Sequence, residues 1–312
     1  MATLKDRFLF ACAPDSWGVL DYPGPSWNQS YELMLDEMLE AGYTGTELGP
    51  YGFFPTDPAV LQPQLDKRRL KLLGSFVPVK MTEPAAGGAV IERIRKVGHL
   101  LATLKAPFLV MADDQSAERN AYAGRAYDSG CPALTSAQWK HVGNIVADAE
   151  KVAQEFGLDL VFHPHIATYV ETTEECEKLF DATSHTNMGL CLDTGHCFYA
   201  HGDPVAEAER YKSKLRLVHL KDCDNNILEL SRRNRWTFEE AVENKAFTII
   251  GQGNINFPAF FRTLLKTDYS GWSVIEQDVK FGATEIPPKV SVAASLKYLN
   301  GLVDSLAQAA GA

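Results

Sequence analysis

Short apolar runs alternate with amphipathic stretches along the whole chain, and this rhythm limits the folds that the sequence can adopt. Eight apolar runs have the length of buried strands, at residues 8–13, 44–50, 70–79, 107–112, 158–163, 188–192, 215–220 and 272–275. Segments with apolar residues at helical spacing follow most of them, at residues 31–41, 90–104, 136–156, 173–180, 203–211, 258–265 and 291–309. Strands that alternate with helices in this way predict a parallel sheet covered by helices.

Eight strand–helix units in 312 residues are what a (β/α)8 barrel requires. A doubly wound sheet normally has fewer strands and carries a Gly-rich turn after an early strand, and the motif G-x-G-x-x-G does not occur here. No linker-like stretch divides the sequence. We therefore predict an α/β fold, a single TIM barrel over residues 1–312, with an insertion at about residues 223–253 after the seventh strand.

The net charge and the cysteine pattern limit the molecules that this protein is expected to bind and the cellular compartment in which it is expected to work. The formal net charge is −10, which repels the phosphates of nucleic acids. The longest basic cluster, Lys67, Arg68, Arg69 and Lys71, is interpreted as a solvated helix end. Six cysteines without a CxxC pair are typical of reduced thiols. No segment approaches the roughly 18 apolar residues of a membrane span, and the first apolar run is short for a secretion signal. We expect a cytoplasmic protein that binds neither nucleic acid nor membrane.

Polar side chains gather at the predicted carboxyl ends of the strands, where barrel enzymes carry their catalytic groups. Glu47 ends the second strand, and four of the eight histidines lie at the ends of the fifth to seventh strands. The full set after strands five to eight is His163, His165, Asp193, His196, His219, Lys221 and Glu276. This uneven distribution predicts one polar site on one side of the barrel mouth.

Alternation along each strand predicts which of these side chains enter the lumen. Cys191 shares a face with Asp193, Leu217 with His219, and Val274 with Glu276. One imidazole or carboxylate is thus expected from each of four consecutive strands, at His163, Asp193, His219 and Glu276. Mixed ligands of this kind suit Mn²⁺, Co²⁺, Zn²⁺ or Fe²⁺ better than Ca²⁺. The alternatives are that Asp193 caps the next loop and that Glu276 pairs with Lys221.

Several motifs resemble one superfamily. DTGH (193–196), VHLKD (218–222) and IEQD (275–278) resemble the xylose-isomerase-like superfamily of sugar isomerases, epimerases and dehydratases, which are (β/α)8 barrels with a divalent metal. CAPDSWGV (12–19), GYTGTELGPYGFFP (42–55), HPHIATYVET (163–172) and IIGQGNINFPAFF (249–261) are similar to its myo-inosose-2 dehydratase branch, which acts in inositol catabolism. The resemblance covers nearly the whole chain.

The resemblance implies a set of metal ligands. Asp193, His219 and Glu276 fall on the superfamily's ligands from strands six, seven and eight. The fifth strand usually supplies a glutamate, but His163 stands there, so the fourth ligand is His163, His165 or a returning Glu171. The site is thereby less anionic, which favours a transition ion over Mg²⁺. Mn²⁺ or Co²⁺ is expected first, with Zn²⁺, Fe²⁺ or Mg²⁺ as the alternatives.

The resemblance also implies a reaction, the dehydration of a cyclic keto-polyol such as 2-keto-myo-inositol. The metal would acidify the proton next to the ketone. The candidate bases are His165, Glu47 and Glu276, and the candidate acids are His196 and Lys221. A nearby cation is expected to lower the pKa of Lys221, unless this residue forms an ion pair with Asp222 or Glu276. His196 falls where epimerases of the superfamily hold substrate, and Trp17 is expected to form a platform for the ring or to pack at the rim.

Other functions remain open at this point. Isomerisation or epimerisation of a keto-sugar, and β-elimination from a 3-keto-glycoside, begin with the same proton transfer. An apurinic endonuclease, another branch of the superfamily, conflicts with the negative charge, and a non-catalytic sugar-binding barrel has little need of a metal. Glu47 is alternatively a carboxylate neutralised by a lysine or arginine. Residues 224–245 are expected to form a lid or a contact in a homo-oligomer, with Arg232, Arg233 and Arg235 in a solvated loop.

Overall fold

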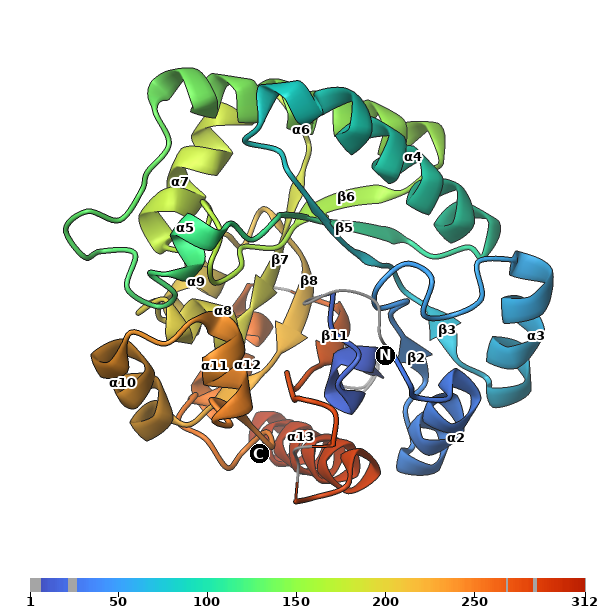
Figure 1. Cartoon of the computed structure of the whole chain (residues 1–312). Coiled ribbons are helices and arrows are strands. Elements are labelled where there is room, and N and C mark those ends of the chain that lie inside the picture. Colours follow the sequence, from blue (N-terminus) through green and yellow to red (C-terminus); the bar gives the residue numbers. More distant parts are fainter. Residues whose placement is uncertain (1–6, 22–26, 268, 283–284, 312) are drawn as a thin grey trace.

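The computed structural model describes residues 7–21, 27–267, 269–282 and 285–311. Its main sheet contains nine parallel strands in the order β3-β2-β1-β11-β8-β7-β6-β5-β4 (Figure 1). These strands are β1 (Phe8–Cys12), β2 (Gly45–Thr46), β3 (Lys71–Leu72), β4 (Phe76–Val79), β5 (Phe108–Asp113), β6 (Asp159–Phe162), β7 (Gly189–Asp193), β8 (Leu215–Leu220) and β11 (Gly271–Ile275).

The sheet closes on itself because β3 and β4 belong to one extended segment. β3 pairs with β2, and β4 pairs with β5. The segment was predicted as a single strand, but it is interrupted at residues 73–75, where Gly74 runs so close to Phe108 that a Cβ would lie 2.8 Å from the Phe108 carbonyl oxygen. Hydrogen bonds from Leu48 to Gly74 and from Val110 to Ser75 keep both neighbours attached there. The predicted TIM barrel is confirmed.

Helices surround the barrel, and the sequence pattern predicted all of the outer ones except the helix at residues 58–68. The outer helices are α2 (Tyr31–Ala41), α3 (Pro58–Arg68), α4 (Gly87–Thr103), α6 (Ser136–Glu155), α7 (Thr173–Ala182), α9 (Pro204–Arg210), α12 (Phe257–Lys266) and α13 (Pro288–Gly311). Short helices stand in the loops: η1 (Pro14–Trp17), η2 (Pro84–Ala86), α5 (Ala117–Asn120) and α8 (Thr194–Tyr199). Within the described residues, no helix combines the length and the apolar character that a membrane span requires.

The interpretation of the basic cluster was wrong for Arg68. Its side chain is buried, and Nε donates to Oδ1 of Asp36 at 2.6 Å, while Nη2 donates to the carbonyl of Glu32. The guanidinium therefore ties α3 to α2, whereas Lys67 and Arg69 on either side are exposed. Helical periodicity could not reveal this, because the partner lies on another helix.

An apolar layer fills the lumen below the barrel mouth. It consists of Ala11, Ala13, Leu73, Val110, Val161, Cys191, Leu217 and Val274. Residues two positions further along the chain from Val161, Cys191, Leu217 and Val274 are the four candidate metal ligands. Because side chains alternate along a strand, each candidate ligand continues the lumen face one layer closer to the mouth.

The insertion is an ordered substructure. It contains a two-stranded antiparallel ribbon, β9 (Asp222–Cys223) with β10 (Phe247–Thr248), and the helices α10 (Asn225–Asn234) and α11 (Phe238–Glu243). The Asp222 carboxylate accepts hydrogen bonds from the backbone of Cys223, Gly251, Gly253 and Ile255. A Cβ at Gly253 would lie 2.3 Å from Oδ1 of Asp222, so the carboxylate and this glycine fit together. Arg232 was expected in a solvated loop, but it lies on α10 and its side chain donates a hydrogen bond to the carbonyl of Tyr199.

Candidate metal and substrate site

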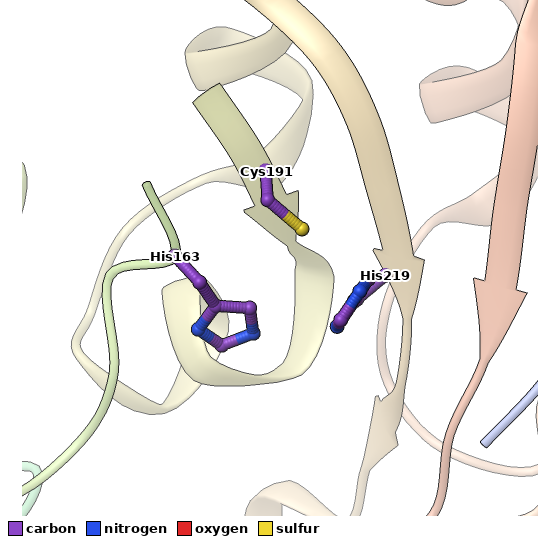
Figure 2. Close-up of side chains that lie close together, drawn as sticks. All are labelled: His163, Cys191 and His219. Atoms are coloured by element: carbon purple, nitrogen blue, oxygen red, sulfur yellow. The ribbon is translucent and has the colours of Figure 1, made fainter. Parts of the chain in front are cut away.

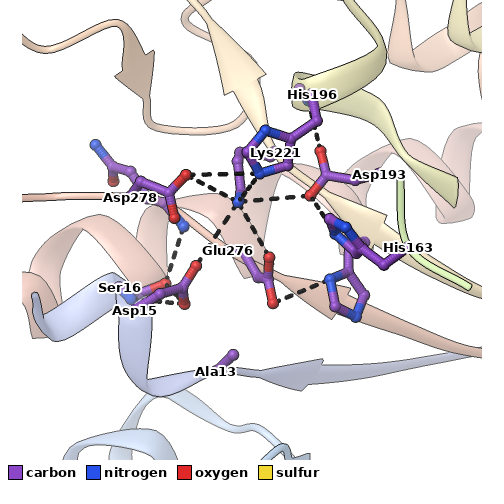
Figure 3. A network of polar contacts seen from close by, with 12 residues as sticks. Ala13, Asp15, Ser16, His163, Asp193, His196, Lys221, Glu276 and Asp278 are labelled. Atoms are coloured by element: carbon purple, nitrogen blue, oxygen red, sulfur yellow. Dashed lines mark hydrogen bonds and ion pairs between the residues drawn. The ribbon is translucent and has the colours of Figure 1, made fainter. Parts of the chain in front are cut away.

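Four side chains converge at the mouth of the barrel from four neighbouring strands. His163 follows β6, Asp193 ends β7, His219 lies on β8 and Glu276 follows β11. Their possible ligand atoms all lie within 4.8 Å of one another, and all four residues are buried. Figure 3 shows this cluster and the polar contacts around it. The structure thus brings together the four residues that the sequence analysis selected as ligands.

Several atoms of this cluster lack hydrogen-bond partners. His163 Nδ1, Asp193 Oδ2 and His219 Nδ1 are buried and accept or donate no hydrogen bond within the part of the chain that the structure describes. The nearest approaches are 3.5 Å from His163 Nε2 to Asp193 Oδ2 and 3.1 Å from His219 Nδ1 to Glu276 Oε1. Buried polar atoms without partners are costly unless a cation satisfies them. This donor set therefore fits a divalent ion.

Asp193 uses its two carboxylate oxygens differently. Oδ1 accepts a hydrogen bond at 2.8 Å from the backbone of His196 and caps α8, which was the alternative role for this residue. Oδ2 has no hydrogen bond and faces His163 and Lys221. Capping and ligation are therefore compatible, since the cap holds the carboxylate in place.

Glu47 reaches His219 from the far wall of the lumen. Its Oε1 lies 3.1 Å from His219 Nε2, and the residue is 1% exposed. No lysine or arginine neutralises it among the described residues; its partner is the imidazole of a candidate ligand. Carboxylates in this position orient a ligand histidine and fix its tautomer.

His165 and His196 stack on one another beside the cluster. Their ring centroids are 3.9 Å apart, and Nδ1 of His165 lies 2.7 Å from the carbonyl oxygen of Ile166. Burial, helped by His163 and Lys221, lowers the pKa of His165 to about 3. Burial and the neighbouring His165 hold the pKa of His196 well below its usual value. Both imidazoles are therefore neutral at physiological pH.

Lys221 is the buried cation of the site. Its Nζ lies 3.0 Å from Asp278, 3.2 Å from Glu276, 3.5 Å from Asp193 and 3.9 Å from Asp15, and 3.1 Å from His196 Nε2. Burial alone would lower its pKa, but the surrounding carboxylates, Asp193 and Asp278 foremost, raise the pKa well above the usual value. The alternative that the sequence left open, an ion pair of Lys221 with Glu276, is the one observed.

Sequence reasoning did not select Asp15, Asp278 or Phe76, which also line the site. Asp278 lies two residues beyond Glu276, so the alternation that selected Glu276 could have indicated it as well. Phe76 begins β4, and its ring meets His163 edge-on at 5.3 Å. Asp15 had no periodic signal, because it enters the site from the η1 turn rather than from a strand.

Two predicted site residues lie elsewhere. Trp17 is 6% exposed and donates its indole N–H to Glu37 on α2 at 2.7 Å; it belongs to the packed core rather than to the cavity lining. Its alternative role, packing at the rim, is the one observed. Glu171 accepts hydrogen bonds from the backbone of Ala167 and Gly124 and lies 4.0 Å from Arg119, so it does not reach back to the metal cluster.

A cavity of about 70 Å³ adjoins the cluster. Its lining includes three of the four candidate ligands, His163, His219 and Glu276, together with Glu47, His165, His196 and Lys221. Phe238 of the insertion packs 5.1 Å from the His165 ring, and Phe247 packs 5.7 Å from His196. The insertion therefore packs against one side of the site, and its role as a lid or as a contact in a homo-oligomer stays a prediction.

The closed barrel and the cluster of histidines and carboxylates at the ends of its strands define a (β/α)8 barrel protein with a candidate metal-binding site. The chain belongs to the xylose isomerase-like TIM barrel family, whose sequence model matches residues 35–302. The resemblance inferred from the motifs is thereby confirmed.

Individual relatives agree with this assignment. The inosose dehydratase of Geobacillus kaustophilus (strain HTA426) is 30% identical over 278 residues, which are 89% of this chain and 90% of the relative. The rhizopine catabolism protein MocC of Rhizobium meliloti is 34% identical over 268 residues, 86% of this chain and 81% of the relative. The crystal structure of the IOLI protein with a bound zinc atom has the same fold, with a TM-score of 0.71 at 14% identity over 95% of this chain and 98% of that one.

Proposed function

We propose that this protein catalyses the metal-dependent dehydration of a cyclic keto-polyol of the 2-keto-myo-inositol type. The observation that carries the proposal is the four-strand cluster of His163, Asp193, His219 and Glu276. Within the described residues, one buried atom each of His163, Asp193 and His219 has no hydrogen-bond partner. It occurs in a chain about 30% identical to inosose dehydratases over most of its length. A cavity of about 70 Å³ lies beside the cluster and is lined by His165, His196 and Lys221.

In this proposal the four residues hold a divalent ion, Mn²⁺ or Co²⁺ first. When bound, the ion would polarise the ketone and make the neighbouring C–H more acidic. His219 is held for this task by Glu47 on its other nitrogen. Asp193 is held by its bond to the His196 backbone, so two ligands are oriented before any ion binds.

We assign the role of base to His165. Its Nδ1 is bonded to a carbonyl oxygen and therefore carries the proton, which leaves the Nε2 lone pair for the substrate. The neutral state that burial imposes keeps this nitrogen available as an acceptor across the working pH range. Glu47 and Glu276 are less suited, because Glu47 is hydrogen-bonded to His219 and Glu276 is itself a candidate ligand, whose Oε2 lies 3.2 Å from Lys221 Nζ.

We assign to Lys221 the protonation of the departing hydroxyl. Surrounded by carboxylates, it stays an ammonium, and it donates to Asp278 and faces His196 Nε2. A raised pKa does not prevent this step, since hydroxide is the conjugate base of water, whose pKa is about 15.7. His196, which is bonded to Lys221, positions the ammonium and contacts the substrate in this scheme.

The test is mass spectrometry of 2-keto-myo-inositol incubated with the protein and Mn²⁺ or Co²⁺. We expect loss of one water from the substrate with metal and none with a chelator. His165→Gln should lose turnover while the matched control at an exposed histidine, His185→Gln, should keep it. The experiment is run in deuterated water as well, so that proton exchange is followed separately from dehydration.

Other outcomes would redirect the proposal. Entry of deuterium next to the ketone without loss of water would replace dehydration by isomerisation or epimerisation. Release of an alcohol from a 3-keto-glycoside, with keto-inositol untouched, would replace it by β-elimination from glycosides. Turnover that survives complete removal of metal would overturn the metal dependence itself.

A further inference from the structure

Cys191 lies in the lumen directly below the candidate metal cluster. It belongs to β7, is fully buried, and sits in the apolar layer with Val161, Leu217 and Val274. It precedes Asp193 by two residues on the same face of the strand, which separates their Cα atoms by about 6.5–7 Å along the barrel. Among the residues that line the cavity described above, Cys191 is not found. It therefore takes no part in the proposed reaction.

The thiol nevertheless forms a ligand group with the two histidines of the site. Figure 2 shows Cys191 between His163 and His219, which come from the strands on either side. A ring nitrogen of each histidine and the sulfur all lie within 4.8 Å of one another. In a zinc site, ligand atoms stand roughly 3.5 Å apart, given bond lengths of about 2.0–2.3 Å. Small side-chain adjustments would close the group around an ion.

The chemistry of this group differs from that of the carboxylate group. Asp193 and Glu276 supply hard oxygen ligands that suit Mn²⁺ and Co²⁺, whereas a thiolate with imidazoles selects soft ions such as Cd²⁺, Cu⁺ or Zn²⁺. Both groups use His163 and His219, so two ions would compete for the same imidazoles. An ion drawn toward the sulfur would also lie one layer further from the cavity.

We propose that His163, Cys191 and His219 form a second, deeper metal position that takes soft ions and excludes the ion held by the carboxylate group. The position binds metal without supporting turnover, because its surroundings are apolar side chains that substrate does not reach. Soft divalent or monovalent ions are thus competitive inhibitors with respect to Mn²⁺. The binding itself is independent of the proposed reaction; only the inhibition rests on the proposed function.

The test uses metal-free full-length protein titrated with Cd²⁺ and, separately, with Co²⁺, without substrate. We expect Cd²⁺ to give a near-ultraviolet thiolate-to-metal absorption band that saturates at one ion per chain. Cys191→Ser and Cys191→Ala should each remove this band. The matched control, Cys176→Ser, changes a buried cysteine on α7 outside the barrel and should leave the band intact.

Competition provides a second readout. Bound Mn²⁺, followed by electron paramagnetic resonance, should be displaced by Cd²⁺ from the unmodified protein. In Cys191→Ser the displacement should require roughly tenfold more Cd²⁺ or more, since even outer-sphere partners change metal affinity by 10–100-fold. Circular dichroism confirms that each variant is folded.

Two results would overturn the deeper position: stoichiometric Cd²⁺ binding to the unmodified protein with no thiolate band, or a band that persists in both Cys191 variants. Because the band is recorded without substrate, failure of the dehydration assay leaves this test unaffected. Conversely, a protein that dehydrates keto-inositol but shows no thiolate band keeps the proposed function and loses the second position.

Discussion

Glu47 and His219 come from opposite walls of the barrel and meet in its lumen, with Oε1 of the glutamate 3.1 Å from Nε2 of the histidine. The other nitrogen of His219 faces Glu276. Glu47 therefore holds one edge of the imidazole and leaves Nδ1 directed at the candidate ion site beside Glu276, which is how carboxylates orient metal-bound histidines in many centres. Glu47 acts on the site through His219.

Replacing Glu47 by glutamine should weaken metal binding by about 10–100-fold, because the histidine loses the anion that fixes its orientation. Titration of metal-free protein with Mn²⁺, followed by electron paramagnetic resonance, measures this. Glu155→Gln, at an exposed glutamate paired with Arg95, is the control and should bind Mn²⁺ normally. Equal affinity in both variants would remove the positioning role from Glu47.

Replacing Lys221 by methionine should lower kcat by about 10²-fold or more, since a proton donor in the transition state contributes on that scale. Mn²⁺ should still bind, because the four candidate ligands remain. Steady-state turnover of 2-keto-myo-inositol and Mn²⁺ titration separate the two effects. A variant with normal kcat would assign the proton to another group of the site.

Asp113 makes stability depend on pH. Burial raises its pKa from 3.8 to about 7, while the backbone N–H of Tyr169, which donates to Oδ2 at 3.0 Å, opposes the shift. Between pH 4 and 7 the folded state therefore holds a proton that the unfolded state releases. The free energy of unfolding from this group falls as pH rises through that window. Asp113→Asn keeps the acceptor and should flatten the slope, measured by urea unfolding at several pH values. A slope unchanged by the substitution would contradict the shift.

Arg119 fixes the long β5–α6 loop. Its side chain is 1% exposed and donates to both carboxylate oxygens of Glu175, at 2.8 and 3.0 Å, and to the carbonyl of Pro132. Arg119→Met leaves the partner carboxylate without its counter-ion and should lower the free energy of unfolding by about 3–5 kcal/mol. Arg95→Met, which breaks an exposed pair with Glu155, should leave the free energy of unfolding almost unchanged. Urea denaturation compares them, and similar losses would refute a special role for Arg119.

Period-2 alternation predicted the site well where it lies on strands. Asp193, His219 and Glu276 project where it placed them, because a parallel barrel strand has only two faces and the inner one leads to the mouth. The same alternation gave no prediction for residues that lie outside the strands. Asp15 arrives from a 3₁₀ turn, and Trp17, four residues after the end of the apolar run, turns outward to α2.

The charges that surround Lys221 could not be predicted from the sequence either. The pKa of Lys221 depends on Asp15, Asp193, Glu276 and Asp278, which are up to 206 residues away in the chain and meet only in the folded barrel.

The N-terminus of α6 shows a smaller limit of prediction from sequence. The helix begins at residue 136 as predicted, but Thr135 rather than Ser136 is its N-cap and forms the capping box with Gln138. Both side chains are good caps and differ by one position, which the sequence pattern does not resolve.

Closure of the barrel by β1 and β11 has a consequence for synthesis of the chain. These strands pair from Phe8 with Gly271 to Cys12 with Ile275, and Glu276 follows directly. A ribosome that has finished α12 has therefore exposed His163, Asp193 and His219 but has not yet made the carboxylate that completes the cluster. The cluster of His163, Asp193, His219 and Glu276 can therefore assemble only after translation has passed Glu276 and β11 has paired with β1.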